Sequence, residues 1–270
     1  MRFPMAAVMC PLDVGHEDVE VIEVLLDGRQ KARCPDCDFS WVHGEAQPAF
    51  SPRAAQQTSL HMPTADSVSS AAMDRAERLK PVFLSQKHAG LDPRVPAFWE
   101  KYQHIFSEEG LPHADPADLR AFGKDTSGSN LGIQATFRRA FDDNPEYSAG
   151  QVRQVVDYLL RGTGKPLEDR LTDLINGKLP FSFPGFKELL LSKVLSVVYP
   201  ERFLTLLTYE QKTIAAKDVY GLDLPAYDRA RIGHQIVRSN DLLAELAGDG
   251  FLHGPHAGEF LWWAQRQPQT

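Results

Sequence analysis

The placement of the cysteines is the feature of this sequence that most constrains its fold. The chain contains three cysteines, all within the first 37 residues, and two of them form the Cys-x-x-Cys pair Cys34 and Cys37. Such a pair typically binds a metal or cycles as a redox couple, and a structural zinc ion needs about four ligands. An odd number of cysteines favours a metal site over a disulfide framework. We therefore expect a metal site near the N-terminus.

The remaining ligands must come from the segment around Cys10, because both cysteine-containing segments begin with Cys-Pro. A zinc ribbon would have a second cysteine three residues after Cys10, where this chain has Asp13. Imidazole is commoner than carboxylate in closed structural zinc sites. Asp13 and His43 are alternatives for the fourth ligand. We predict a structural Zn²⁺ bound by Cys10, His16, Cys34 and Cys37.

Alternating apolar residues surround these cysteines. Residues 18–28 are rich in β-branched side chains and end in Asp27-Gly28, a common hairpin turn, and residues 39–44 are compatible with a further strand. The arrangement resembles a zinc ribbon over residues 10–44. A domain of under about 40 residues needs a staple such as zinc. The resemblance therefore implies a small β unit stabilised by a metal.

A basic stripe is predicted between the two cysteine segments. Arg29, Lys31 and Arg33 lie two residues apart, so one face of a strand would carry all three. A stripe of this kind can follow a phosphate backbone, although a solvated strand face explains the same pattern. Acidic residues between 17 and 23 would partly neutralise it, and the net charge of −7 argues against a nucleic-acid binder that uses its whole surface.

Three zones differ in composition. Residues 1–46 contain the cysteines, and residues 47–78 are rich in Ala, Ser, Gln and Pro, which predicts a flexible linker. Residues 79–270 show the apolar periodicity of helices, for example over 95–110, 149–162, 167–178, 186–200, 226–239, 241–248 and 258–267. We predict an α+β fold class, with a small N-terminal β zinc ribbon linked to a mainly α-helical domain.

The turn Pro184-Gly185 precedes an apolar helix and is reminiscent of a helix-hairpin-helix, whose turn directs backbone N–H groups at a phosphate. The second glycine of that motif is replaced by Lys187. Lys187 and Lys193 are the candidate phosphate contacts of this segment.

Short motifs follow one another across residues 179–265: the Gly185 turn, Ser192-Lys193-Val194-Leu195, Pro200, Asn240-Asp241-Leu242-Leu243 and Phe260-Leu261-Trp262-Trp263. Their order resembles the helical region that precedes the motor in McrB-like modification-dependent restriction GTPases. The resemblance implies recognition within a restriction or antiviral defence system, beside a motor NTPase or a nuclease subunit.

The segment 161–166 lacks the glycine and the Ser or Thr of a phosphate-binding loop.

These observations predict a non-catalytic DNA-recognition protein. No nucleophile elbow is present, and no apolar run reaches the roughly 18 residues of a membrane span, so we expect a cytoplasmic chain without a membrane partner. The net negative charge favours an alternative, a protein-interaction adaptor that does not bind DNA. A third hypothesis is an enzyme with an unrecognised site in the helical domain. The basic stripe and the resemblance favour DNA recognition.

Overall fold

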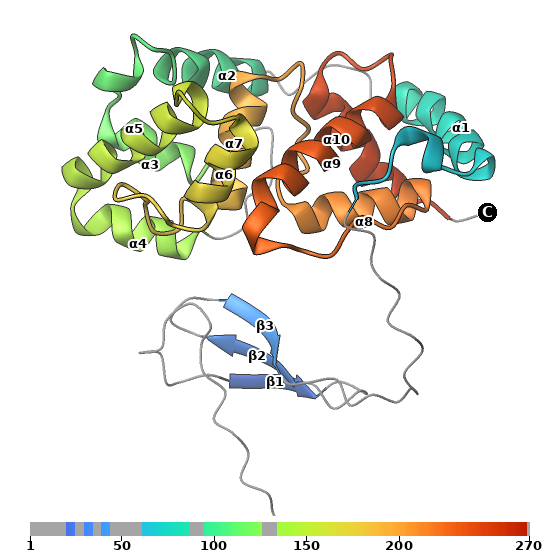
Figure 1. Cartoon of the computed structure of the whole chain (residues 1–270), viewed down its shortest axis with the longest axis horizontal. Coiled ribbons are helices and arrows are strands. Elements are labelled where there is room, and N and C mark those ends of the chain that lie inside the picture. The colour runs from blue at the N-terminus through green and yellow to red at the C-terminus, as the bar shows by residue number, and fades with distance from the viewer. Residues whose placement is uncertain are drawn as a thin grey trace, which may run out of the picture. The chain divides into compact units, whose positions relative to one another are not determined.

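The computed structural model describes residues 20–24, 30–34, 39–43, 61–86, 94–125 and 134–268. The chain divides into two compact units, Met1–Gln57 and Thr58–Thr270 (Figure 1). Within the described residues, every strand belongs to the first unit and every helix to the second.

The first unit contains three short antiparallel strands in the order β1-β2-β3 (Figure 1). They are β1 Glu20–Val24, β2 Gln30–Cys34 and β3 Phe39–His43. Ala32 and Cys34 lie two residues apart in β2, and both side chains are fully buried. Because alternate residues of a strand share a face, these two positions define the buried face of β2.

The second unit is built from ten helices and three short 3₁₀ turns in its described residues. The helices are α1 Ser70–Gln86, α2 Arg94–Ile105, α3 Pro116–Phe122, α4 Ala135–Asp143, α5 Pro145–Arg161, α6 Leu167–Ile175, α7 Glu188–Val198, α8 Tyr209–Tyr220, α9 Ile232–Ala247 and α10 Gly254–Ala264. The 3₁₀ turns are η1 Ala65–Ser67, η2 Leu111–His113 and η3 Arg229–Arg231. None of the helices in the described part of the chain has the length and apolar character to cross a bilayer.

The predicted α+β class is wrong for this protein. That class describes helices and strands that belong to one layered core. In the described residues from 61 to 268 the secondary structure is helical without a strand, and the hydrophobic core lies entirely within this helical unit. The fold is therefore that of a helical domain, and the three short strands lie in a separate unit.

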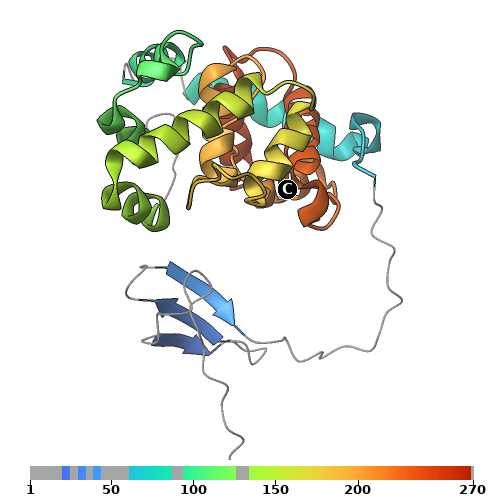
Figure 2. The ribbon, with the colours of Figure 1, turned by 60° about the vertical axis from the view of Figure 1, so that its left-hand side comes forward.

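Helix α6 packs against α9 and links two groups of helices (Figures 1 and 2). On one side α5 contacts α3, α4, α6 and α7, and α2 packs on α7; on the other, α8 and α10 contact α9 and α1. Helix α7 is buried over most of its length, from Leu190 to Val197. A helix that is apolar on nearly all sides takes a central place in the core, as α7 does here.

Helix α1 begins inside the range predicted as a linker, so the linker does not extend through residues 70–78. In its first half Ala76 is buried and Met73 is partly buried against the core, too few apolar residues to give a clear helical pattern. Phe83 anchors the second half, with its ring centroid 5.6 Å from Phe260 and 5.7 Å from Trp263 of α10. Arg75 donates to the carbonyl of Gln267 at 3.0 Å. The helix is thus held by distant partners that a local pattern does not show.

Helix α9 is continuous through Asn240, although the sequence pattern predicts two helices, over 226–239 and 241–248. The Asn240 side chain is buried; its Oδ1 accepts from the Leu204 N–H at 3.0 Å and its Nδ2 donates to the Arg202 carbonyl at 3.0 Å. The residue therefore joins the middle of α9 to the segment after α7 and caps no helix.

Candidate anion-binding site

The predicted zinc ligands can be placed only in part. Cys34 ends β2 opposite Phe39 of β3, and its side chain is fully buried. Cys10, His16 and Cys37 lie outside the described residues. Within those residues, no group of three or more His, Cys, Asp or Glu is arranged to hold a metal. Three thiolates and one imidazole are a suitable donor set for a structural zinc ion. Because three of the four predicted ligands lie outside the described residues, the zinc site stays a prediction.

The predicted basic stripe lies partly in β2, while Arg29 falls outside the described residues. In the register of the first two strands, Lys31 is opposite Glu23 and Arg33 is opposite Glu20. Residues directly opposite on antiparallel strands share one face of the sheet, and opposite charges there attract. The register therefore places each of these two basic positions opposite an acidic position of β1.

The structure contradicts the predicted phosphate contact at Lys193. This residue of α7 is 0% exposed, and its Nζ donates to the carbonyls of Phe122, at 3.0 Å, and Asp125. The Nζ also lies 4.7 Å from the ring centroids of Phe98 and Phe122. Burial lowers the pKa of Lys193 to about 7, against the opposing effect of Asp125. Lys193 is a packing residue, out of reach of nucleic acid.

Lys187 is half-buried just before α7 and already has a partner. Its Nζ donates at 3.2 Å to the carbonyl of Leu174 near the end of α6. Burial lowers the pKa of Lys187, and the charge of Arg229 adds to the effect. A lysine on the last carbonyls of a helix stabilises the C-terminal end. Its role in the structure is to cap α6.

The Pro184-Gly185 turn packs against the first turn of α4. Gly185 has a φ of +73°, and a Cβ built there would lie 2.3 Å from the backbone N of Phe137. Glycine is therefore required both by the left-handed conformation and by the close approach of the two segments. This contact explains the glycine without a phosphate.

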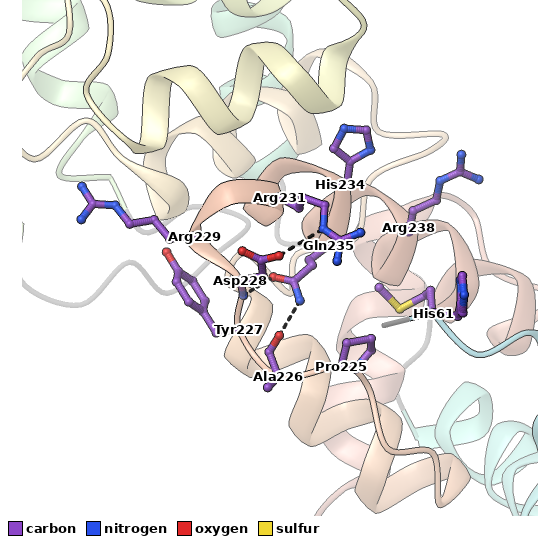
Figure 3. A pocket seen from close by; sticks show the side chains of 11 residues that line it. His61, Pro225, Ala226, Tyr227, Asp228, Arg229, Arg231, His234, Gln235 and Arg238 are labelled. Atoms are coloured by element: carbon purple, nitrogen blue, oxygen red, sulfur yellow. Dashed lines mark hydrogen bonds and ion pairs between the residues drawn. The ribbon is translucent and has the colours of Figure 1, made fainter. Parts of the chain in front are cut away.

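A cavity of about 440 Å³ lies beside the N-terminal half of α9 (Figure 3). It is rich in cationic side chains and has one carboxylate among its lining residues. The lining residues are His61, Met62, Pro225, Ala226, Tyr227, Asp228, Arg229, Arg231, His234, Gln235 and Arg238.

The spacing along α9 brings several of these side chains to one side of the helix. His234 and Arg238 are four residues apart in α9, which places them on a common face, and Arg231 directly precedes the helix. Gln235, which is buried, ties this face to the opposite wall: its Oε1 accepts from the Asp228 N–H at 2.8 Å and its Nε2 donates to the Ala226 carbonyl at 2.7 Å (Figure 3). The wall at 226–228 is thereby fixed against the helix.

The cations around the cavity are only partly neutralised. Arg231 Nε lies 3.1 Å from Asp228 Oδ2, and this contact, with a backbone hydrogen bond from Ala230, lowers the pKa of Asp228. Arg229 Nε donates to Asn176 Oδ1, a neutral acceptor, at 3.0 Å. Arg238 is exposed and has no ion pair within the described part of the chain. Since each guanidinium has five N–H donors, most donors remain available to an anion.

The residues of this cavity are not among the binding residues predicted from the sequence. The relevant signal is the Arg-x-x-His-x-x-x-Arg spacing from Arg231 to Arg238, within the segment predicted as a helix. His61 joins the cavity from a part of the chain more than 160 residues earlier, and no local pattern links it to α9.

No family model, curated protein or solved structure matches the chain. The function is therefore inferred from the geometry of the α9 cavity. Chemically, three guanidinium groups about one cavity can bind a phosphate or another polyanion, since the planar fork of arginine matches such oxygens in pairs.

Proposed function

We propose that the chain is a non-catalytic nucleic-acid recognition protein that contacts phosphates at the α9 cavity. The observation that carries this proposal is the gathering of Arg229, Arg231 and Arg238 around one cavity whose lining has a single carboxylate, Asp228. Half to two-thirds of protein–DNA hydrogen bonds go to phosphate and sugar oxygens, and arginine is a common donor. Tyr227, which is 57% exposed at the same cavity, offers a ring on which a base can stack.

This proposal keeps DNA as the partner but moves the contacts away from β2 and α7. Lys193 is buried and Lys187 caps a helix, whereas the arginines at α9 have donors to spare. A place in a restriction or antiviral defence system, beside a motor NTPase or nuclease subunit, is supported only by the order of the short motifs from Gly185 to Trp263.

The test is a fluorescence anisotropy titration of the whole chain with a labelled DNA duplex and with one of its strands, across a range of salt concentrations. Each phosphate contact adds about −0.9 to the log–log salt slope for a duplex and about −0.7 for a single strand. Replacing Arg229, Arg231 and Arg238 together by alanine should weaken binding and flatten the slope by up to three contacts. Arg238→Ala alone should flatten it by about one contact.

Arg138→Ala is the matched control, because Arg138 is also an exposed helical arginine but lies in α4. It should leave the slope unchanged. The double change Lys31→Ala and Arg33→Ala tests the strand face in the same way. A slope that survives the triple change would place the phosphate contacts outside the α9 cavity.

A protein-interaction adaptor is the second candidate. It is favoured by the register of β1 and β2, which sets Glu20 and Glu23 opposite Arg33 and Lys31, and by the net charge of −7. Flat titrations with duplex and single strand at low salt, with and without modified cytosine, would favour this adaptor over DNA recognition.

A further inference from the structure

The lining of the α9 cavity is of two kinds. Met62, Pro225 and Tyr227 offer apolar surface, whereas Arg231 and Arg238 supply positive charge. Phosphate oxygens bind to N–H and O–H donors and gain nothing from an apolar lining. The apolar part of the lining therefore indicates that an uncharged part of the ligand also enters the cavity.

The three arginines are spread along the cavity. Figure 3 shows Arg229 and Arg238 on opposite sides of the lining, with Arg231 between them. All three side chains are exposed. One phosphate cannot contact cations on both sides at once, whereas the successive phosphates of a strand can. The spread of charge therefore favours a polyanionic strand over a free phosphate ion.

Access to the base distinguishes a single strand from a duplex. The volume of about 440 Å³ is in the range of sites that enclose small molecules, and it is too small for any section of a duplex. In a duplex the faces of each base are covered by its stacked neighbours, so a base reaches a protein pocket only when it leaves the stack. The ring of Tyr227, which is 57% exposed, is open to the face of an unpaired base.

Three polar side chains that could read the edge of a base are already engaged. Both ends of the Gln235 amide are hydrogen-bonded to the backbone of the facing wall. The Asp228 carboxylate accepts from Arg231 and from a backbone N–H, and His234 Nε2 lies 2.9 Å from Asp169 Oδ1. A base in this cavity would therefore be held by its face, and a face is common to all four bases.

We propose that the α9 cavity binds single-stranded DNA of any sequence, with one unpaired base on its apolar lining and the neighbouring phosphates on its arginines. The inference rests on the nucleic-acid contacts proposed above and adds the form of DNA that they select. The base packs against Pro225 and Tyr227, and the phosphates on either side of it bind Arg229, Arg231 and Arg238. A duplex would reach the exposed arginines and would leave the apolar lining in contact with water.

The test is a fluorescence anisotropy titration of the whole chain with four labelled DNAs of equal length: oligo(dT), oligo(dA), a blunt duplex and an abasic strand. The two single strands should bind within about threefold of each other, and about tenfold or more tighter than the duplex. The abasic strand keeps the phosphates but loses the base, so it should bind about tenfold more weakly than oligo(dT).

Equal affinities for strand and duplex, with a salt slope that still depends on the arginines, would overturn the single-strand inference and leave the proposed phosphate contacts standing. A preference of more than about tenfold for oligo(dT) or oligo(dA) would overturn the contact through the base face. Thymidine monophosphate that competes as well as oligo(dT) would overturn the strand in favour of a free nucleotide.

Tyrosine variants separate base packing from charge. Tyr227→Ala should weaken single-strand binding about tenfold while the salt slope and the duplex affinity stay the same. Tyr227→Phe keeps the ring and should bind the strand as the unchanged chain does. Tyr147→Ala is the matched control, because Tyr147 is 64% exposed but lies in α5 and does not line the cavity. Equal effects of Tyr227→Ala and Tyr147→Ala would overturn the packing of a base at this cavity.

Discussion

The two units of the chain differ in what can stabilise them. The helical unit has one continuous apolar core that runs from Ala76 in α1 to Ala264 in α10. In the first unit, the buried side chains that the structure describes are Ala32 and Cys34. Domains of this size bury too little surface for apolar burial alone to hold them, and many rely on a metal or on disulfides. We therefore expect the first unit to depend on metal–ligand bonds and the helical unit on apolar packing.

Metal removal should have the largest effect and should act on one unit only. Binding of a structural zinc ion contributes on the order of 10 kcal/mol to folding of such small units. We expect about one zinc per chain by elemental analysis, and loss of the metal together with ordered β1–β3 signals in NMR spectra on chelation or in Cys34→Ser. The helical signals should not change. His16→Ala and His43→Ala decide between the two candidate imidazole ligands.

Protein purified without a chelator and found to hold no zinc would contradict the metal prediction. If chelation also altered the helical signals, the prediction that the helical unit is stabilised by its apolar core without the metal would be wrong.

In the helical unit the largest effect should come from Lys193. Lys193→Ala leaves a cavity beside Phe98 and Phe122 and removes the Nζ hydrogen bonds to two carbonyls, at a cost of about 3–5 kcal/mol. Lys193→Met keeps the volume and loses only the polar contacts, so we expect a smaller loss of about 1–3 kcal/mol. Urea unfolding followed by circular dichroism measures both.

Lys187→Met is the comparison within the same segment, because Lys187 is half-buried and its Nζ donates to one carbonyl, that of Leu174, among the described residues. It should cost about 1 kcal/mol or less. A Lys193→Ala variant as stable as Lys187→Met would show that Lys193 is not enclosed in the core.

The contrast between these lysines shows what the sequence could predict. Local periodicity was enough to predict α5, α6, α7 and α10, because each has apolar residues at helical spacing, and the first three are closely followed by Gly162, Gly177 and Pro200. The place of Lys193 was not predictable, since its acceptors on Phe122 and Asp125 lie 71 and 68 residues away in the sequence. From the sequence alone, a lysine in an apolar helix is expected to lie at the surface. The structure instead buries Lys193 in the core.

The α9 cavity could not be predicted from the sequence for the same reason. The sequence does show His234 and Arg238 at the spacing of one helix face, with Arg231 just before them. The cavity itself depends on the 225–228 segment being held by Gln235, and on His61 arriving from another part of the chain. Neither contact follows from a local pattern, because both are made only when the helical unit packs.

The final predicted effect is a pH dependence confined to the helical unit. Burial lowers the pKa of Lys193 to about 7 and that of Lys212 to about 8, against the opposing charges of Asp125 and Glu188. In an unfolded chain both lysines titrate near 10.4. Between about pH 7 and pH 10 the unfolded state therefore binds more protons than the folded state. Stability must rise with pH across this window, by about 1 kcal/mol per pH unit for each lysine.

The rise should end near pH 10, because buried tyrosines act in the other direction. Burial raises the pKa of Tyr209 to about 12 and also raises the pKa values of Tyr102 and Tyr220. Above about pH 10 the unfolded chain loses tyrosine protons that the folded state keeps, so stability falls again.

Urea midpoints at pH 7, 8 and 9, followed by helical circular dichroism, should increase in that order. In Lys193→Met the increase should shrink to the part that Lys212 supplies, since the titrating group at position 193 is gone while the fold is kept. A wild-type midpoint that stays level or falls from pH 7 to 9 would mean that both lysines keep an ordinary pKa, and hence that water reaches the centre of the helical core.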